Sequence, residues 1–395
     1  MENKMTNLPQ GWEVKTLSEI GEIITGSTPS KSNVEFYRKD YPFFKPSDFE
    51  QGYFLENAGD NLSKLGFGKA RQLPPKTILV VCIGSLGKVA LTRVIGSCNQ
   101  QINAIIPHKN IISEYIYYYC ISSKFQSILF SKAPQTTLAI FNKTEFSKLE
   151  IIYPKDIKEQ ERIVGILDFA FSKIDENIKK AKENLANIDE LMRSALQKAF
   201  NPLKDNAKEN YKLPQSWEWK SLEEISENIS AGGDKPKNCT ESKTAKNQIP
   251  VYANGVNNNG LVGYTDKATI IKPSLTISAR GTIGFVCIRK EPYFPIVRLI
   301  SLIPCENILC LHYLYFCLNF FIAKGEGSSI PQLTIPKFKS LQIPLPPLKE
   351  QEQIAEHLDF VFEKAKALKE LYTKELKDYE ELKQSLLNKA FKGEL

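Results

Sequence analysis

The segment Lys158-Glu159-Gln160-Glu161 decides the fold, because it opens a long charged stretch and returns as Lys349-Glu350-Gln351-Glu352. When residues 158–200 are set against residues 349–391, 18 of 43 positions are identical. Self-similarity on this scale indicates an internal duplication. The 395-residue chain is therefore expected to contain two copies of one module, each with a body followed by a long helix.

The openings of the two halves also match. Leu8-Pro9-Gln10-Gly11-Trp12-Glu13 returns as Leu213-Pro214-Gln215-Ser216-Trp217-Glu218 at an offset of 205 residues, whereas the long stretches match at an offset of 191. The first body is thus about 14 residues longer than the second, and the helices have no net insertion. We interpret this as a shared structural role for the helices and separate recognition roles for the bodies. Two similar surfaces related by a pseudo-two-fold axis suit an extended ligand with two separated parts, such as duplex DNA.

The positive charge of the chain lies in the bodies. The formal net charge is +7, and basic residues outnumber acidic ones by 18 to 14 in residues 1–157 and by 17 to 12 in residues 201–348. The two long stretches have no such excess. A positive surface favours contact with phosphates. The alternative is that the surplus lysines only aid solubility.

Residues 158–200 and 349–391 are expected to be helical, since neither stretch contains proline. Asp156 and Glu159 have the spacing of a capping box at the start of the first helix. At 1.5 Å per residue each helix would extend roughly 65 Å, and such a helix needs a partner along its apolar stripe. We expect the two helices to pair antiparallel as a coiled coil. The alternative is that each helix packs on its own body.

The apolar stripes follow steps of three and four residues. In the first helix the stripe consists of Phe171, Ile174, Ile178, Ala181, Leu185, Ile188, Met192, Ala195 and Ala199. In the second helix a less regular stripe consists of Ile354, Leu358, Val361, Ala365, Leu368, Tyr372, Leu376, Tyr379, Leu386 and Ala390.

The bodies are predicted to be α+β, built around a mixed or antiparallel sheet. Strand-like runs at residues 77–83, 102–106, 274–278 and 297–303 alternate with helical runs at 113–130 and 311–323. Aromatic residues at helical spacing are interpreted as core, with base stacking as the alternative: Tyr115, Tyr118, Tyr119, Phe125, Tyr313, Phe316 and Phe320. Gly84 and Gly87 recur as Gly281 and Gly284, and this favours a tight turn over a phosphate-binding loop.

Polar loops supply candidate DNA contacts, because Asn and Gln can pair with adenine, Arg with guanine, and Lys with phosphates. The alternative for the Asn-rich segments is a simple turn. The candidates in the first body are Ser27, Thr28, Lys31, Asn33, Arg38, Lys39, Lys45, Arg93, Asn99, Gln100 and Gln101. The candidates in the second body are Lys235, Lys237, Asn254, Asn257, Asn258, Asn259, Arg280, Thr282 and Arg298.

The sequence lacks signatures of catalysis. It contains no phosphate-binding G-x-x-x-x-G-K-[ST] loop, no nucleophile elbow, and no Asn/Asp-Pro-Pro-Tyr/Phe tetrapeptide for holding a flipped adenine. Cys305, Cys310, His312 and Cys317 cluster without the spacing of zinc ligands. With three histidines in the chain, acid–base chemistry is also disfavoured. We therefore expect a protein without catalytic, cofactor-binding or metal-binding residues.

The composition indicates a cytoplasmic protein. No signal peptide is apparent. The eight cysteines are scattered, and because most of them lie in apolar runs, we interpret them as reduced core thiols. The apolar stretch from Leu309 to Ala323 is interrupted by His312 and Asn319 and is too short to span a bilayer. We expect no association with a membrane.

The combination of motifs resembles the specificity subunits of type I restriction–modification systems over the whole chain. Its strongest part is Leu341-Gln342-Ile343-Pro344-Leu345-Pro346-Pro347-Leu348-Lys349-Glu350-Gln351 with Ile354-Ala355, followed by a long helix. The Leu-Pro-x-x-Trp openings, with Leu17/Leu222 and Ile20/Ile225 behind them, belong to the same pattern. The first copy departs from this pattern, because it has Tyr153-Pro154-Lys155-Asp156-Ile157 before its helix, where the second copy has Pro346-Pro347-Leu348.

The resemblance implies target-recognition domains at residues 1–157 and 202–347, each reading half of a bipartite DNA site, and conserved spacer helices at 158–201 and 348–395. It implies that the helices set the unread gap and dock two modification subunits, with restriction subunits joining later. S-adenosylmethionine, ATP and Mg would then be held only by those partners. Candidate residues for docking and spacing are Gln160, Ile163, Leu167, Ile174, Ile178, Leu185, Ile188, Met192, Gln351, Ile354, Leu358, Leu376, Tyr379 and Leu386.

Two other classes of protein stay open at this point. The first is a single-chain DNA methyltransferase or nuclease, which the missing motifs disfavour. The second is a coiled-coil scaffold that joins proteins without binding DNA.

Overall fold

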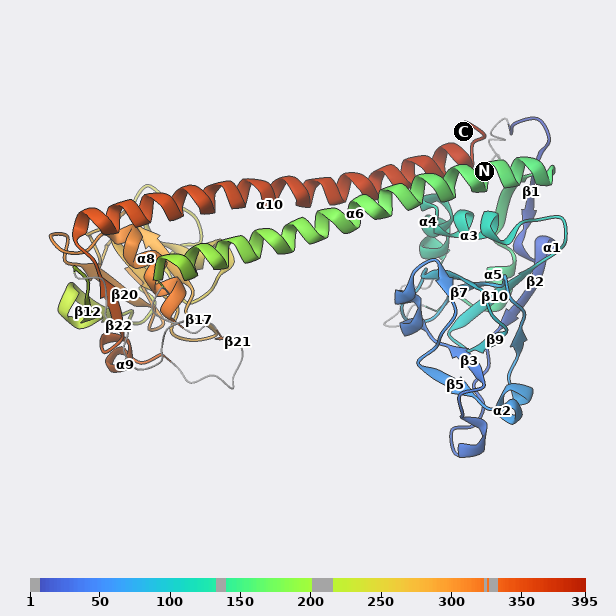
Figure 1. Ribbon diagram of the computed structural model, residues 1–395, viewed down its shortest axis with the longest axis horizontal. Helices are drawn as coiled ribbons and strands as arrows, with labels where there is room; N and C mark the ends of the chain where they lie inside the picture. Colours follow the sequence, from blue (N-terminus) through green and yellow to red (C-terminus); the bar gives the residue numbers. More distant parts are fainter. Residues whose placement is uncertain (1–7, 133–139, 201–215, 323–324, 327–332) are drawn as a thin grey trace. The chain divides into compact units, whose positions relative to one another are not determined.

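The computed structural model describes residues 8–132, 140–200, 216–322, 325–326 and 333–395. The chain divides into two compact units (Figure 1). Unit 1 comprises Met1–Ala181 and Thr373–Leu395, and unit 2 comprises Lys182–Tyr372. Leu213, Pro214 and Gln215, from the second opening motif, lie outside the described residues.

The main sheet of unit 1 has the strand order β2-β10-β7-β8-β4. Its strands are β2 (Gly21–Thr25), β10 (Ile102–Pro107), β7 (Ile78–Val81), β8 (Val89–Thr92) and β4 (Phe54–Leu55). Neighbouring strands run antiparallel, except that β4 is parallel to β8. The mixed sheet predicted from the sequence is therefore confirmed.

Two smaller sheets complete the strands of unit 1. One has the order β5-β3-β9-β6, and the other pairs β1 with β11 antiparallel. Their strands are β5 (Asp60–Leu62), β3 (Tyr41–Phe44), β9 (Gly96–Cys98), β6 (Gln72–Leu73), β1 (Trp12–Thr16) and β11 (Glu150–Pro154). Because β3 runs parallel to β9, the loops that follow these two strands emerge at the same edge.

Helices α3 (Ser113–Ile121) and α4 (Ser123–Lys132) of unit 1 replace the single helix predicted over residues 113–130. Ser122 is extended, with ψ of 147°, and its hydroxyl accepts a hydrogen bond from the Phe125 amide at 3.3 Å. A serine that caps a new helix in this way ends the preceding one. The remaining helical segments of the unit are α1 (Leu17–Ile20), α2 (Lys64–Lys69), α5 (Lys143–Ser147), η1 (Val34–Phe36) and η2 (Pro46–Gln51).

Unit 2 repeats this plan in shorter form. Its main sheet has the order β13-β20-β16-β18, which matches β2-β10-β7-β8 of unit 1. Its other sheets are β15-β14-β19, β12-β22 and β17-β21. The strands are β12 (Glu218–Ser221), β13 (Ser226–Ala231), β14 (Ile249–Tyr252), β15 (Leu261–Thr265), β16 (Ser274–Ile277), β17 (Thr282–Ile283), β18 (Val286–Arg289), β19 (Phe294–Pro295), β20 (Ile300–Pro304), β21 (Gly325–Glu326) and β22 (Gln342–Leu345).

The helical segments of unit 2 are α7 (Leu222–Ile225), α8 (Leu311–Phe321), α9 (Ile335–Lys339) and η3 (Asn257–Gly260). The strand predicted over residues 297–303 begins only at Ile300, because residues 296–299 form a turn. The aromatic residues predicted as core are confirmed in that role, since Tyr115, Tyr313 and their neighbours on α3 and α8 are buried. Phe320 is partly buried beside the same core.

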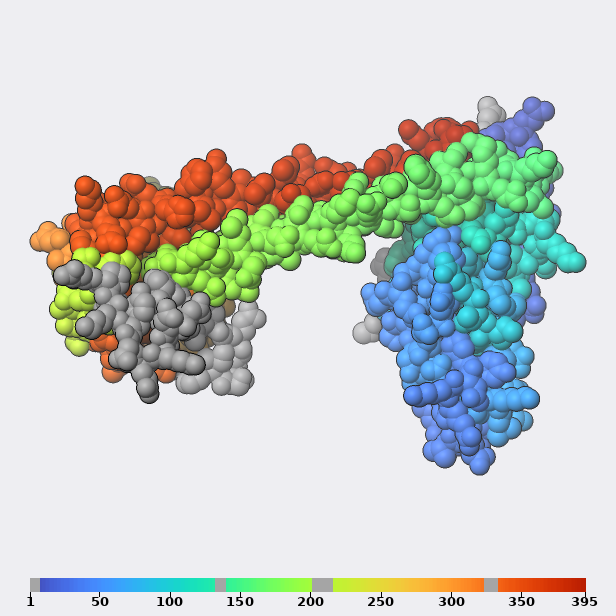
Figure 2. Space-filling view, viewed as in Figure 1, coloured from blue at the N-terminus to red at the C-terminus, as the bar shows by residue number. Residues whose placement is uncertain are grey.

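The two long helices are α6 (Ile157–Phe200) and α10 (Leu348–Ala390). In unit 1, Lys383 contacts Asp175 at 2.6 Å and Arg162 donates to the Leu395 carbonyl at 2.8 Å, so the helices run antiparallel (Figure 2). In unit 2, Lys369 contacts Asp189, and Phe200 shares a core with Leu358. The predicted antiparallel pairing is confirmed.

The helices also pack on the bodies, so the alternative interpretation is partly correct as well. Ile163 and Leu167 of α6 join Leu387 and Ala390 of α10 in the core of unit 1, beside α3 and α4 (Figure 1). Each long helix therefore contributes to the core of both units. The stripe predicted for α10 needs two corrections, because Leu387 is buried where Leu386 is only partly covered, and Leu368 is exposed.

The start of α6 carries half of the predicted capping box. The Asp156 carboxylate accepts from the Lys158 amide at 3.0 Å, as an N-cap residue does. The Glu159 carboxylate instead pairs with Arg162 at 2.7 Å, and this contact lowers the pKa of Glu159. A charged partner one turn further along the helix thus takes the place of the reciprocal bond.

All eight cysteines are free thiols, and burial raises the pKa of Cys82 and Cys98 to about 12. Within the part of the chain that the structure describes, no helix combines the length and apolarity needed to cross a bilayer.

Candidate nucleic-acid interface

Four loops of the first body meet at one edge of its sheets. They follow β2, β3, β7 and β9, and we call them the first loop cluster: residues 26–33, 45–48, 83–87 and 99–101. Backbone hydrogen bonds join them, from the Ser27 amide to the Cys98 carbonyl at 3.0 Å and from the Asn99 amide to the Phe44 carbonyl at 3.1 Å. The Cys82 amide donates to the Gln101 carbonyl at 2.7 Å. Main-chain contacts therefore position the side chains that this edge presents.

The second body builds the same arrangement, which we call the second loop cluster: residues 232–239, 253–259, 279–284 and 296–298. The Arg298 amide donates to the Gly232 carbonyl at 2.9 Å, and the Ile296 amide donates to the Tyr252 carbonyl at 2.8 Å. These loops follow β13, β14, β16 and β19, which correspond to β2, β3, β7 and β9. The duplication thus places two comparable loop clusters on one chain.

Glycines make the close approach of these loops possible. A Cβ atom on Gly26 would lie 2.1 Å from the Asn99 carbonyl oxygen, and one on Gly232 would lie 2.6 Å from the Ile296 nitrogen. Both distances are too short for a side chain. The recurring glycines of the tight turns have positive φ, 80° at Gly84 and 69° at Gly281, which confirms the turn interpretation.

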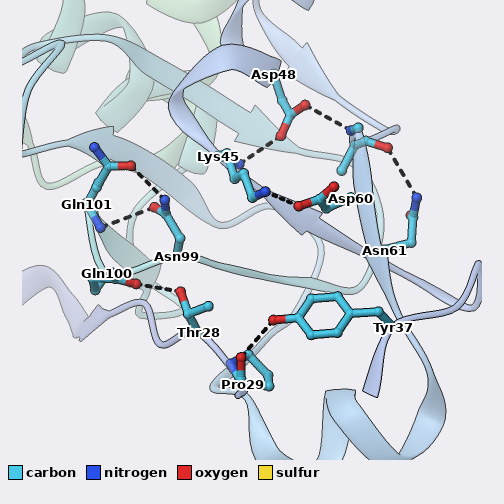
Figure 3. Close-up of polar contacts among 12 residues, drawn as sticks. Thr28, Pro29, Tyr37, Lys45, Asp48, Asp60, Asn61, Asn99, Gln100 and Gln101 are labelled. Carbon is cyan, nitrogen blue, oxygen red and sulfur yellow. Dashed lines mark hydrogen bonds and ion pairs between the residues drawn. The ribbon is translucent and has the colours of Figure 1, made fainter. Parts of the chain in front are cut away.

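The amide side chains of the first loop cluster contact one another (Figure 3). The Thr28 hydroxyl donates to Gln100, and Asn99 Nδ2 donates to Gln101 Oε1 at 2.8 Å. Gln101 in turn donates to the Ile83 carbonyl at 3.4 Å. Asn99 is only 8% exposed, so it holds Gln101 in place, whereas Thr28 and Gln100 lie on the surface. The structure brings these four predicted residues together.

Two lysines add positive charge to this cluster. The Lys45 ammonium contacts Asp60 beside η2 (Figure 3). Burial lowers the pKa of Lys45, the charge of Lys31 lowers it further, and Asp48 opposes both effects. A phosphate near these lysines would relieve their repulsion.

Arg71 belongs to the same surface, although sequence reasoning missed it. Its amide donates to Ser27 Oγ at 3.1 Å, and its guanidinium donates to the Thr25 carbonyl at 2.5 Å. A single basic residue after a helix gives no pattern that could have identified it. Ser27 thus orients the backbone at Arg71.

Three other candidates of the first body lie at the end of the 26–33 loop or just beyond it, and a fourth lies away from the first loop cluster. The Asn33 side chain caps η1 through the Glu35 amide at 3.1 Å, and the exposed Arg38 and Lys39 precede β3. Arg93 follows β8, at the opposite end of the β7/β8 pair from Gln101. It pairs with Glu56 at 2.7 Å and lies 3.8 Å from the centre of the Phe54 ring. Arg93 therefore does not join the loop cluster.

Asn254 connects two turns of the second loop cluster. Its Nδ2 atom donates to the Val297 carbonyl at 2.6 Å, and its Oδ1 atom accepts from the Ala279 amide at 2.8 Å. The residues that follow these contact points are Arg298 and Arg280. The Asn254 side chain therefore connects the two turns, and each turn carries one of the arginines. Thr282 lies in the same turn as Arg280.

The remaining candidates of the second body are solvent-exposed. Lys235 and Lys237 lie in the loop after β13. Asn257, Asn258 and Asn259 form η3, in which Asn258 and Asn259 have φ of 46° and 52°. Asparagine tolerates this conformation, so the turn interpretation holds for the backbone of this segment.

Arg289 supports the Asn-rich turn and was missed by the sequence analysis. It is buried, donates to Thr276 Oγ1 at 3.0 Å, and also donates to the Asn259 carbonyl. Its guanidinium lies 3.5 Å from the centre of the Tyr252 ring. An arginine at the end of the otherwise apolar strand β18 was the signal that could have identified it.

The candidates on the long helices face their own chain. The Gln160 side chain accepts from the Ile112 amide at 2.9 Å and donates to the Pro154 carbonyl at 2.9 Å. Its counterpart Gln351 accepts from the Cys310 amide at 2.9 Å and donates to the Pro346 carbonyl at 2.8 Å. Both glutamines are fully buried, so these side chains fasten the helices to the bodies and cannot contact a partner.

The apolar candidates on the helices fall into two groups, according to how far the chain covers them. Those buried within the chain are Ile163, Leu167, Ile174, Ile178, Ile188 and Leu358. Those partly covered are Leu185, Met192, Ile354, Leu376, Tyr379 and Leu386. The residues of the buried set pack within the chain, so their side chains are not available to a partner subunit.

The described residues thus form two loop clusters, one on each of two duplicated α+β bodies. Residues 9–187 and 214–377 match the type I restriction modification DNA specificity domain. The chain therefore belongs to the family of type I restriction–modification DNA specificity proteins.

Relatives of the chain are named as specificity subunits of type I restriction enzymes. The specificity subunit of the type I restriction enzyme HindI from Haemophilus influenzae is 39% identical over 176 residues, which are 43% of this chain and 38% of that subunit. The MjaIX specificity subunit from Methanocaldococcus jannaschii is 24% identical over 399 residues, which are 92% of this chain and 89% of that subunit. The match thus spans less than half of the Haemophilus relative and most of the Methanocaldococcus one.

Solved structures share the fold. A chain from a type I restriction–modification system, studied for its complex assembly and conformational transition, is 19% identical with a TM-score of 0.82 and covers 99% of this chain and all of that one. The HsdS subunit from Thermoanaerobacter tengcongensis is 20% identical with a TM-score of 0.59 over the whole of both chains. These likenesses confirm the predicted fold class.

Proposed function

We propose that this chain is the DNA specificity subunit of a type I restriction–modification complex. Each body, at residues 1–157 and 202–347, reads one half of a bipartite site through its loop cluster. The observation that carries this proposal is the repetition of four loops on matched strands within a family of DNA specificity proteins. Basic residues near the loops contact phosphates, and amide and guanidinium groups contact base edges.

The spacer helices, at residues 158–201 and 348–395, set the gap between the half-sites in this proposal. Buried Gln160 and Gln351 support it, because each fastens a helix to its body through hydrogen bonds to the backbone. A helix fixed at both ends transmits a defined length of 1.5 Å per residue. The unread gap would then be a property of helix length and not of the loops.

Two modification subunits dock on the helices in this proposal, and the repeat suggests where. The segment Leu167-Asp168-Phe169-Ala170-Phe171-Ser172-Lys173 returns as Leu358-Asp359-Phe360-Val361-Phe362-Glu363-Lys364. Most of its repeated residues have partners within the chain. Asp168 accepts from the Tyr118 hydroxyl at 2.6 Å, and Asp359 contacts His312 at 2.7 Å.

Phe169 and Phe360 differ from these residues because they face solvent. Phe169 is 68% exposed and Phe360 is 61% exposed, whereas the neighbouring Phe171 and Phe362 pack edge-on against Tyr118 and Phe316. An exposed phenylalanine contributes little to the stability of its own chain. Its presence at the same position in both copies favours a partner that binds twice.

Methylation of adenine and cleavage of DNA belong to the partner subunits in this proposal, and restriction subunits join the complex of this chain with its modification subunits. S-adenosylmethionine, ATP and Mg are then bound outside this chain. The absence of a methyltransferase tetrapeptide and of a phosphate-binding loop from the sequence supports this division.

The proposal is tested by expressing the chain with its modification subunit in a host that lacks other adenine methyltransferases, and by mapping methylated adenines. We expect a bipartite motif with a fixed gap that disappears when the chain is omitted. Tight binding of S-adenosylmethionine by the chain alone would favour the methyltransferase alternative. A complex that gives no salt-dependent gel shift with DNA would favour the scaffold.

A further inference from the structure

The turn at residues 296–299 of the second loop cluster has an unfavourable backbone. It is closed by a hydrogen bond from the Leu299 amide to the Ile296 carbonyl at 3.1 Å. Its central residues, Val297 and Arg298, have φ of 51° and 58°. Asparagine and glycine are the usual residues at such positions, and a β-branched valine is a genuine outlier there. The chain holds this turn against the local preference of its residues.

The fold does not require this strain, as the matching turn of the first body shows. That turn is closed by the same bond, from the Ile102 amide to the Asn99 carbonyl at 3.2 Å. Its central residues, Gln100 and Gln101, are both described by the structure, and neither has positive φ. The unusual conformation is therefore specific to the second body.

Three hydrogen bonds from two neighbouring loops hold the strained turn. The Val297 amide donates to the Gly233 carbonyl at 2.8 Å, and the Arg298 amide donates to the Gly232 carbonyl at 2.9 Å. On the other side, Asn254 donates to the Val297 carbonyl at 2.6 Å. Because the main chain is fixed on both sides, the direction in which the Arg298 side chain leaves the surface is fixed too. Strain that is held in place in this way is a common property of ligand-contacting sites.

Arg298 itself is exposed, and within the described residues its guanidinium has no hydrogen-bond or ion-pair partner. The side chain that the strained turn presents is therefore available to a ligand. An arginine held at a DNA-reading edge is suited to the O6 and N7 acceptors of guanine, which its planar fork can contact together.

We propose that Arg298 contacts a guanine in the half-site read by the second body, and that Asn254 is its positioning residue. This inference rests on the proposed function and adds the chemical identity of one base. Asn254 acts through the turn and touches no DNA. It also accepts from the Ala279 amide, so it keeps the Arg280 turn in register with the Arg298 turn.

The test compares methylation motifs produced by variants of the full chain with its modification subunit. Arg298→Ala is expected to relax one G·C position of the second half-site and to leave the first half-site and the gap unchanged. Discrimination for guanine at that position is expected to fall roughly 5- to 150-fold, the range for loss of one bidentate contact. Arg298→Lys keeps the charge without the fork, so it is expected to relax the same position.

Asn254→Ala, with Arg298 intact, is expected to relax the same base pair as Arg298→Ala. A general loss of structure would instead weaken the whole half-site, and thermal unfolding of the variant measures that effect separately. Lys290→Ala is the control, because exposed Lys290 follows β18 at the end of the β16/β18 pair opposite to Arg280. It is expected to leave the motif unchanged.

The inference is overturned if Arg298→Ala leaves the second half-site intact, or if the relaxed position is not a G·C pair. It is also overturned if the variant weakens binding equally for all sequences while lowering the salt dependence, as loss of a phosphate contact would. Failure of the proposed function looks different, because the unmodified chain would then direct no bipartite methylation at all.

Discussion

Single buried side chains join the helices to the bodies in both halves. Gln160 and Gln351 each bond one backbone amide and at least two backbone carbonyls. Leucine at either position would leave those groups buried without partners, at a cost of about 1–3 kcal/mol for each unsatisfied group. The glutamine of the repeated Lys-Glu-Gln-Glu segment thus makes the same buried hydrogen bonds in both copies.

We predict that Gln160→Leu and Gln351→Leu each lower the midpoint of thermal unfolding by several degrees. Hydrogen exchange localises the effect, since the Ile112 amide is expected to exchange faster in the first variant and the Cys310 amide in the second. Gln353→Leu is the matched control, because Gln353 is exposed on the same helix as Gln351. Equal destabilisation by the control would contradict the role of the buried bonds.

At the scale of the element, each long helix has two different surfaces. One surface is buried in the chain, and the other presents Phe169 on α6 and Phe360 on α10. The inward surface packs in the cores of the two units, whereas the outward phenylalanines do not contribute to either core. The two phenylalanines occupy equivalent positions in the repeat.

We predict that Phe169→Ser and Phe360→Ser each reduce the number of bound modification subunits from two to one, and that the double variant binds none. The mass of the purified complex measures the stoichiometry. Phe130→Ser is the control, because Phe130 is also exposed but lies on α4. Retention of two subunits by the double variant would show that docking uses another surface.

Sequence patterns predicted the elements better than the loops. The helical stripes depend on local periodicity, so the positions of Ile174, Ile178 and Ile188 were correct. The break at Ser122 was missed because its hydroxyl competes with the helix only once the chain turns there. The strain at Val297 was also missed, since it depends on bonds to Gly233 and Asn254, which are distant in sequence.

The candidate DNA contacts also depend on pairings between residues that are distant in sequence. Thr28 and Gln100, two candidates taken from polar loops, are brought together by the structure, and their contact with DNA stays a prediction. Residue type could not distinguish Arg93, which pairs with Glu56, from Arg71, which lies beside Ser27. Both arginines look alike in the sequence, and only the pairing of strands separates them.

At the scale of the whole molecule, we predict that helix length sets the gap between half-sites. Insertion of one heptad into α6 after Ala181 and one into α10 after Tyr372 adds about 10 Å of helix and keeps the apolar stripes in register. The gap is expected to lengthen by up to about three base pairs, given 3.4 Å per base pair. Methylation mapping measures it, and altered half-sites would refute a spacer role.

The independence of the two bodies gives a second prediction at this scale. Replacement of residues 202–340 by the corresponding segment of another family member is expected to change one half-site and to preserve the other. The same mapping experiment reads out both. A change in both half-sites would mean that the bodies do not recognise DNA separately.

The loops of both clusters are tied down by main-chain atoms, as between Ser27 and Cys98 or between Arg298 and Gly232. Any residue except proline can make such bonds, so most side chains at the edge are free to vary. Point substitution can therefore change the side chains that each loop cluster presents, while the main-chain framework stays the same. The exceptions are glycines such as Gly26 and Gly232, where even a methyl group would force the loops apart.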